Sequence, residues 1–250
     1  TSVGKTYTAK KIAKHYFGNE KAILQINMSE LYDKTGISKL IGSNSGYIGY
    51  EEGGLLTNFV KENPNCVVLF DEIEKADPQI LNILLHLLDE GYVEDNKHEK
   101  VDFSKCIVVF TSNIGHEKAS KKSMGFVQDE ETKEDSYKSS VRKRLKPELL
   151  ARINQLFVFE DLSDNDFKRI INDELCKIKE KLSAKNIMVK FTSSTVSGIL
   201  NKLKSENLHA RDVKSFVREH VQVPVSKIVI KNSKIKEISV KSVDSKINVC

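Results

Sequence analysis

Residues 67–72 read Val67-Val68-Leu69-Phe70-Asp71-Glu72, an apolar run that ends in two carboxylates. A short continuous apolar run is typical of a strand that is covered on both faces, as in a parallel sheet. A second such run, residues 106–110, is followed by Thr111-Ser112-Asn113. Between the two runs, Asp77-Pro78 supplies a capping carboxylate and a first-turn proline, which predict the start of a helix. This order of strand, helix and strand predicts a layered α/β domain with a parallel sheet.

The first residues of the chain contain part of a phosphate-binding motif. They read Thr1-Ser2-Val3-Gly4-Lys5-Thr6, and a helical pattern follows. Gly4-Lys5-Thr6 is the closing half of the P-loop G-x-x-x-x-G-K-[ST], so we expect the sequence to begin inside this loop. Amide groups at the helix start would face phosphate oxygens, Lys5 would neutralise the β- and γ-phosphates, and Thr6 would bind Mg²⁺. Val3 and Tyr7, on either side of the tripeptide, complete the predicted nucleotide-binding set.

The strand ends supply the remaining groups for ATP chemistry. We expect Asp71 to hold Mg²⁺ through water and Glu72 to polarise the attacking water, as in the Walker B motif. Asn113, at the end of the next strand, could orient that water against the γ-phosphate. Each signal has an ordinary alternative, namely a chance G-K-T or a buried strand that ends in a polar turn. Because all three occur in the expected order, their combination predicts a nucleotide site.

Composition excludes several classes of protein. The 250 residues, 39% hydrophobic and 30% charged, are enough for a sizeable core and argue against wholesale disorder. A net charge of +5 is too small to indicate a nucleic-acid-binding protein. The longest apolar runs are far shorter than a membrane helix needs. The four cysteines lie far apart, which argues against a disulfide scaffold or zinc ribbon and favours a reducing compartment.

The chain divides into two predicted domains near residue 160, where the charge balance changes from slightly acidic to basic. Residues 1–160 form the large α/β domain. Residues 161–250 form a smaller, mainly helical domain, with helices over 164–185, 194–207 and 211–230 and short strands over 187–191 and 235–240. A very polar stretch, residues 115–146, is predicted to be a surface excursion.

The sequence resembles the second ATPase domain of the Clp family of AAA+ unfoldases, closest to the ClpC and ClpA types. The similarity runs nearly from end to end. The blocks that carry it are Asn27-Met28-Ser29-Glu30, Leu40-Ile41-Gly42-Ser43, Gly46-Tyr47-Ile48-Gly49-Tyr50-Glu51-Glu52-Gly53-Gly54, Leu69-Phe70-Asp71-Glu72-Ile73-Glu74-Lys75-Ala76, Val101-Asp102-Phe103, Thr111-Ser112-Asn113, Lys146-Pro147-Glu148-Leu149-Leu150-Ala151-Arg152-Ile153 and Ala210-Arg211.

The resemblance implies a ring, usually a hexamer, that hydrolyses ATP at subunit boundaries and threads protein through its centre. By position, Asn113 matches the sensor 1 residue. Arg152 matches the arginine finger, which reaches the ATP of the neighbouring subunit. Arg211 matches sensor 2 in the small domain, where loss of the γ-phosphate would change the angle between domains.

The resemblance also implies a loop that contacts the threaded protein, Gly46-Tyr47-Ile48-Gly49. Glycines would let this loop flex, and Tyr47 would hold segments of many sequences by apolar contact. The alternative is that Tyr47 is an ordinary core aromatic. Residues 94–99 would form a second, polar pore loop, for which the alternative is a solvated turn.

Within the polar excursion, Met124-Gly125-Phe126 matches the tripeptide with which ClpA- and ClpC-type proteins dock on the ClpP peptidase. An apolar tripeptide among charges often marks a partner site. The alternative is a loop that folds back and buries Phe126.

These features together predict an ATP-dependent unfoldase that feeds ClpP, with ATP and Mg²⁺ as cofactors. Unfolded proteins and adaptor proteins are the expected partners, without nucleic acid or membrane, in a bacterial cytoplasm or an organelle such as a plastid. The first alternative is a ClpB-type disaggregase without peptidase. A nucleic-acid motor and a catalytically weak ring subunit, suggested by Ser2 in place of a glycine, are the others.

Overall fold

The computed structural model describes residues 3–31, 35–114, 133–231, 235–243 and 246–249. Their contacts divide the chain into two compact units, with the division between Phe159 and Glu160. Among the described residues, no helix combines the length and the apolar character needed to cross a bilayer.

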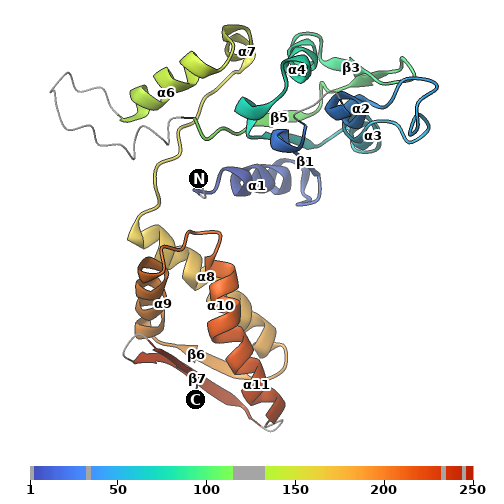
Figure 1. The fold of residues 1–250 in the computed structure, drawn as a ribbon. Helices are drawn as coiled ribbons and strands as arrows, with labels where there is room; N and C mark the ends of the chain where they lie inside the picture. The colour runs from blue at the N-terminus through green and yellow to red at the C-terminus, as the bar shows by residue number, and fades with distance from the viewer. Residues whose placement is uncertain (1–2, 32–34, 115–132, 232–234, 244–245, 250) are drawn as a thin grey trace, which may run out of the picture. The chain divides into compact units, whose positions relative to one another are not determined.

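The first unit is built on a parallel sheet of three strands in the order β1-β2-β5 (Figure 1). The strands are β1 (Ile23–Asn27), β2 (Val67–Asp71) and β5 (Ile107–Phe110). Phe70 in β2 pairs with Ile26 in β1 and with Phe110 in β5. The predicted parallel α/β sheet is therefore confirmed.

Strand β2 is apolar from Val67 to Phe70 because each of its faces is covered. Val67 and Leu69 pack with Ala9 and Ala13 of helix α1 (Lys5–Phe17). Val68 and Phe70 belong to the larger core on the other face, which includes residues of α2 (Thr35–Ile41), α3 (Leu55–Glu62) and α4 (Pro78–Glu90). Alternation along a strand sends neighbouring side chains to opposite faces, so a strand between two helix layers needs apolar residues at every position.

Helix α4 begins where the sequence predicts it. The Asp77 carboxylate accepts a hydrogen bond from the Gln79 amide at 2.7 Å, and Pro78 is the first helical residue. After α4, β3 (Tyr92–Glu94) and β4 (Lys100–Asp102) form an antiparallel hairpin. Short 3₁₀ turns η1 (Met28–Glu30) and η2 (Ile73–Lys75) follow β1 and β2, and α6 (Lys133–Arg144) and α7 (Pro147–Arg152) complete the described elements of this unit.

The second unit packs helices against a small mixed sheet. Its elements are α8 (Asp164–Ser183), β6 (Met188–Phe191), α9 (Ser193–Ser205), α10 (Val213–Val217), the π-helical turn η3 (Arg218–Gln222), α11 (Val223–Lys231), β7 (Glu237–Val243) and β8 (Lys246–Val249). Strand β7 pairs parallel with β6 and antiparallel with β8. The mainly helical small domain is confirmed, but β8 and the π-helical turn inside the helix predicted over 211–230 were not predicted.

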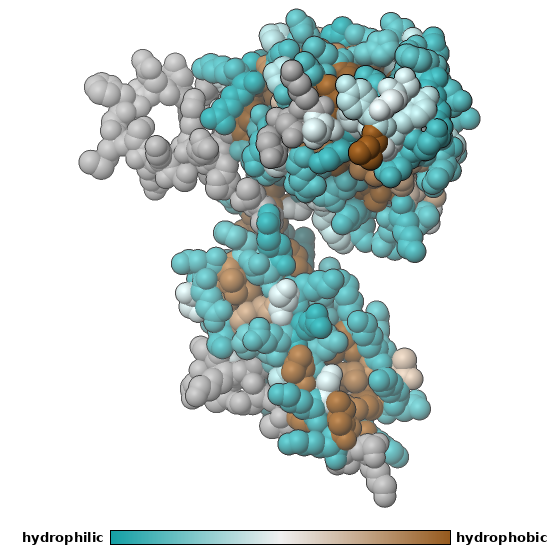
Figure 2. Space-filling model, turned by 45° about the vertical axis from the view of Figure 1, so that its right-hand side comes forward, coloured by the Kyte–Doolittle hydropathy of each residue, from teal (hydrophilic) through white to brown (hydrophobic). Residues whose placement is uncertain are grey.

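The surface of the second unit carries exposed apolar side chains. Brown patches gather on its face in Figure 2. Exposed large hydrophobic residues in this unit include Met188, Val223 and Ile230. Such exposure is compatible with contact to a further protein surface.

Candidate nucleotide site

The start of helix α1 has the features of a phosphate cradle. Gly4 is the N-cap residue, with φ 99°, a left-handed conformation that favours glycine. Among the described residues, no side chain caps the helix start, and a Cβ on Gly4 would meet no atom within 4 Å. The first amides of an α-helix lack partners inside the helix, so an uncapped start such as this one can bind an anion. Val3 lies directly before this turn, and Tyr7 is exposed on the first turn of the helix.

Lys5 reaches from α1 to the end of β5. Its Nζ donates to the backbone oxygen of Ser112 and to Oδ1 of Asn113, both at 2.5 Å. Partial burial lowers the pKa of Lys5, and the charges of the nearby carboxylates Glu74, Asp71 and Glu72 oppose that shift. The lowered pKa shows that the loss of solvent around the ammonium group outweighs the attraction of these carboxylates.

Asp71, the last residue of β2, meets the hydroxyl of Thr6. Thr6 Oγ1 donates to Asp71 Oδ2 at 3.3 Å, and Gln25 Nε2 donates to the same oxygen at 3.0 Å. Thr111 Oγ1 donates to the other carboxylate oxygen. A hydroxyl and a carboxylate are the hard oxygen ligands that Mg²⁺ prefers.

The donor set also fits the way in which Mg²⁺ is held in nucleotide sites. Across the described residues, no group of three or more His, Cys, Asp or Glu side chains could form an all-protein metal cage. Mg²⁺ commonly binds through one or two protein ligands together with substrate phosphates and water. Thr6 and Asp71 could supply that protein share.

Glu72 adopts a backbone conformation that is unusual for its residue type. Its φ of 59° and ψ of 51° place it in the left-handed region, which costs a non-glycine residue about 1–3 kcal/mol. Its amide donates to Thr111 Oγ1 at 3.2 Å. This conformation ends the extended backbone of β2 at Glu72. The side chain of Glu72 lies at the end of the sheet, where Lys5 and Asn113 also lie.

Three donors contact the Glu72 carboxylate. Lys75 Nζ lies 2.7 Å and Ser29 Oγ 2.5 Å from Oε2, and Asn113 Nδ2 lies 3.1 Å from Oε1. The hydrogen bond from Lys75, followed by that from Ser29, lowers the pKa of Glu72. The carboxylate is thus kept ionised, in the form that can accept a proton or orient a water molecule.

Asn113 joins Lys5 to Glu72. Its side-chain oxygen accepts from Lys5 while its amide nitrogen donates to Glu72, and its backbone amide donates to Glu74 Oε1 at 2.9 Å. The other oxygen of Glu74 is buried and has no hydrogen-bond partner among the described residues. The structure therefore brings together three segments that are far apart in the sequence: Lys5-Thr6, Asp71-Glu72 and Asn113.

Sequence reasoning assigned no role to five residues of this network: Gln25, Ser29, Glu74, Lys75 and Thr111. Gln25 had one visible signal, since it is the polar residue of an otherwise mostly apolar strand. Thr111 directly follows β5, and Ser29 lies in the turn η1 that follows β1. Their contacts join segments more than 35 residues apart, so spacing alone could not find them.

Of the two predicted arginines, Arg152 makes its contacts away from the network around Lys5. At the end of α7, Arg152 donates through Nε to Asp89 of α4 and through Nη1 to the Glu148 carbonyl at 2.8 Å. Arg211 belongs to the second unit, just before α10. The roles of both as finger and sensor stay predictions.

The predicted substrate loop is displayed on the surface. Tyr47 is 73% and Ile48 101% exposed, so Tyr47 is not a core aromatic. Gly46 and Gly49 flank them with φ values of 87° and 88°. The tripeptide Met124-Gly125-Phe126 lies outside the described residues.

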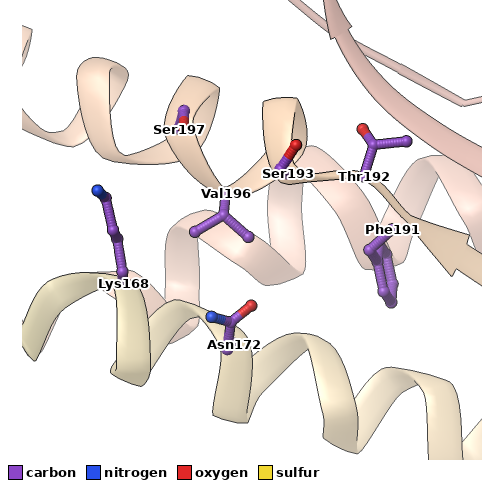
Figure 3. Close-up of a pocket in the computed structure, with 7 residues that line it drawn as sticks. All are labelled: Lys168, Asn172, Phe191, Thr192, Ser193, Val196 and Ser197. Atoms are coloured by element: carbon purple, nitrogen blue, oxygen red, sulfur yellow. The ribbon is translucent and has the colours of Figure 1, made fainter. Parts of the chain in front are cut away.

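A pocket of about 380 Å³ opens in the second unit (Figure 3). Val196 points from α9 towards α8, while Lys168 and Asn172 point from α8 into the same space. None of the residues predicted for nucleotide binding lines it.

Comparison with known proteins finds relatives that match both units of the chain. Residues 1–156 match the family model described as AAA domain (Cdc48 subfamily), and residues 162–242 match the C-terminal, D2-small domain of ClpB protein. The chain is similar to the chaperone protein ClpB of Prochlorococcus marinus, with 36% identity over 93% of the chain, and to that of Rickettsia conorii, with 37% identity over 100% of the chain. It is also 36% identical, over 96% of its length, to the mitochondrial chaperone protein ClpB4 of Arabidopsis thaliana.

A solved structure shares the fold. A closed-state cryo-electron-microscopy reconstruction of Hsp104 with ATPγS and FITC-casein matches with a TM-score of 0.82 and 31% identity, over 100% of this chain and 43% of the Hsp104 chain. The chain spans 27%, 29% and 25% of the three curated relatives.

The names of these relatives correct one expectation. They are ClpB proteins, and they support the Clp second ATPase domain but not a special closeness to ClpC or ClpA. The chain belongs to the AAA domain family of ATPases, with a small C-terminal domain of the ClpB type.

Proposed function

We propose that this chain is the second ATPase domain of a disaggregase chaperone, which uses ATP to extract and thread polypeptides without a peptidase. The observation that carries this proposal is the similarity to ClpB chaperones over 93–100% of the chain. It favours the disaggregase alternative over the ClpP-coupled unfoldase that the tripeptide Met124-Gly125-Phe126 suggested.

The network around Lys5 supports ATP as the substrate. The α1 start and Lys5 would bind the phosphates, and Thr6 and Asp71 would hold Mg²⁺, which supplies positive charge to the phosphate oxygens when bound. The Glu72 carboxylate would accept a hydrogen bond from the attacking water, with Asn113 fixing the direction of that carboxylate. Val3 and Tyr7 flank this site.

A homo-oligomeric ring, by analogy a hexamer, is the assembly we propose. Arg152 would leave Asp89 and contact the ATP of a neighbouring subunit, and Arg211 would report the γ-phosphate to the small domain. An exposed aromatic followed by a fully exposed aliphatic residue, Tyr47-Ile48, suits contact with unfolded segments of many sequences. Casein, in the Hsp104 reconstruction, is a protein of that kind.

The test uses the full-length protein and a heat-aggregated reporter enzyme. Recovery of reporter activity that needs ATP, occurs without ClpP and is lost in Glu72→Gln is the expected result. The same protein is then mixed with ClpP and an unfolded substrate. Degradation that depends on Phe126, together with no recovery of the aggregated reporter, would replace the disaggregase with a protease-coupled unfoldase.

A further inference from the structure

The loop of residues 43–52 displays Tyr47 and Ile48. The turn of the β3–β4 hairpin contacts this loop from the side. Asn96 lies in that turn, between β3 and β4. Its Nδ2 donates to the Ser43 carbonyl at 2.9 Å and to the Tyr50 carbonyl at 2.8 Å. Both hydrogens of one amide group thus join the two ends of the loop. The backbone amide of Asn96 also donates to the Ile41 carbonyl at 2.9 Å.

A second asparagine contacts the far end of the same loop. Asn58 of α3 donates from Nδ2 to the Glu52 carbonyl at 2.7 Å. Each asparagine packs against a glycine with positive φ. A Cβ on Gly42 would lie 2.5 Å from Asn96 Cγ, and one on Gly53 would lie 2.6 Å from Asn58 Oδ1. Glycine at these two positions allows the close approach that the two amides need.

The turn that carries Asn96 is itself rigidly supported. The buried Asp95 carboxylate accepts from the backbone amides of Lys97 at 2.8 Å and Glu99 at 2.9 Å. Lys61 of α3 donates to Asp95 and to Glu99, both at 2.6 Å. The turn is therefore anchored to α3, and a side chain on it can act as a fixed point for the loop.

We propose that Asn96 and Asn58 are positioning residues that hold the loop of residues 43–52 so that Tyr47 and Ile48 contact the threaded polypeptide. This inference rests on the proposed function. The hydrogen bonds of the two asparagines go to carbonyl groups of the loop's backbone, and the side chains of Tyr47 and Ile48 remain exposed for the polypeptide. A force on Tyr47 would pass through the loop carbonyls to the β3–β4 hairpin and α3.

The test compares Asn96→Asp with Asn63→Asp in the full-length assembled protein. Asn96→Asp keeps the shape but replaces two donors with a carboxylate that faces two carbonyl oxygens. Asn63 is a matched control, because its Nδ2 makes one bond, to the Phe59 carbonyl at the end of α3. Asn58→Asp is the second variant, at a more exposed position.

Two measurements are made on each variant. Hydrogen exchange follows the amides of Tyr47 and Tyr50, which are bonded inside the loop. Fluorescence anisotropy follows the binding of labelled casein in the presence of ATPγS. We expect about tenfold faster exchange and about tenfold weaker casein binding for Asn96→Asp, the size expected from losing two hydrogen bonds. Nucleotide affinity is measured in parallel, and Asn63→Asp should match the wild type in all three.

Normal exchange in both Asn96→Asp and Asn58→Asp would overturn the positioning role, as would faster exchange with unchanged casein binding. Tyr47→Ala tests the contact of the loop with substrate separately from the role of the asparagines. If Tyr47→Ala binds casein normally, the proposed contact of this loop with substrate is wrong. If only Tyr47→Ala weakens binding, the proposed function stands and the role of the asparagines is wrong.

Discussion

At Glu72, the backbone conformation and the side-chain contacts together fix the position of the carboxylate. The left-handed backbone costs stability, and three donors fix the carboxylate that results. Strain of this kind persists where the surroundings determine it fully, as at many reaction sites. Because two of the donors, Ser29 and Asn113, follow other strands of the sheet, the position of the carboxylate depends on the packed domain as well as on the local contact with Lys75.

Glu72→Gln should retain ATP binding and lose turnover. The amide keeps the size of the side chain but cannot act as a base, so we expect phosphate release to fall by about 10²- to 10⁴-fold. Nucleotide affinity, measured by titration with a fluorescent ATP analogue, should stay close to wild type. Glu62→Gln, at the exposed end of α3, is the control. Full turnover in Glu72→Gln would remove Glu72 from the reaction.

Lys75 sets the pH range over which Glu72 stays ionised. Its hydrogen bond is the largest cause of the lowered pKa of Glu72. A lowered pKa means that the carboxylate stays charged to a lower pH, and that it is protonated only when pH falls through that lower value. In Lys75→Met the pKa of Glu72 should rise, so the acidic limb of the ATPase pH profile should move to higher pH. Lys75→Arg should restore the wild-type limb, and an unchanged limb in Lys75→Met would show that Glu72 does not control it.

At the scale of elements, the apolar runs and capping residues predicted most of the helices and strands. The runs ending at Phe70 and Phe110 predicted β2 and β5, because a continuous apolar run is typical of a strand covered on both faces. The apolar residues of β2 are fully buried, whereas those of β5 are half-buried. Strand β8 lacked such a signal, since an antiparallel strand at the edge of a small sheet needs no continuous apolar run.

The site was predictable where residues follow strand ends, and not where side chains meet across the fold. Asp71, Glu72 and Asn113 could be placed because parallel strands end at a common edge. The contact between Arg152 and Asp89, and that of Asn96 with the loop of residues 43–52, join elements whose packing no periodicity encodes. A sequence pattern gives the face of an element but not its neighbour.

The capping box of α8 gives a prediction at this scale. Ser163 Oγ accepts from the Asp166 amide at 3.3 Å, and the Asp166 carboxylate accepts from the Ser163 amide at 3.0 Å. Ser163→Ala should lower the stability of α8 by about 1 kcal/mol. Native-state hydrogen exchange of α8 amides measures this, with Ser183→Ala at the other end of the helix as the control. Equal exchange in the two variants would show that the cap contributes nothing.

At the scale of the whole molecule, the contact of Arg152 with Asp89 is weak enough for the arginine to change its partner. The side chains of Arg152 and Asp89 are 33% and 41% exposed, and ion pairs of this exposure contribute about 0–1 kcal/mol. Moving Arg152 from Asp89 to the phosphate of a neighbouring subunit therefore costs little. If Arg152 acts in a ring as proposed, the contact with Asp89 would keep the guanidinium oriented until a second subunit arrives.

Arg152→Ala should leave nucleotide binding near normal and reduce the ATPase of the assembled protein by about 10³- to 10⁵-fold, the range for arginine fingers. Arg169→Ala, which alters an arginine whose side chain is 82% exposed, is the control. An experiment that mixes Arg152→Ala subunits with Glu72→Gln subunits shows whether Arg152 acts on its own subunit or on a neighbour. Arg152→Ala subunits have an intact Glu72, and Glu72→Gln subunits have an intact Arg152, so a mixed ring contains complete sites only if the arginine acts across the subunit boundary. Recovered ATPase in the mixture, with neither variant active alone, is the expected result; a mixture as inactive as its components would place the action of Arg152 within its own subunit.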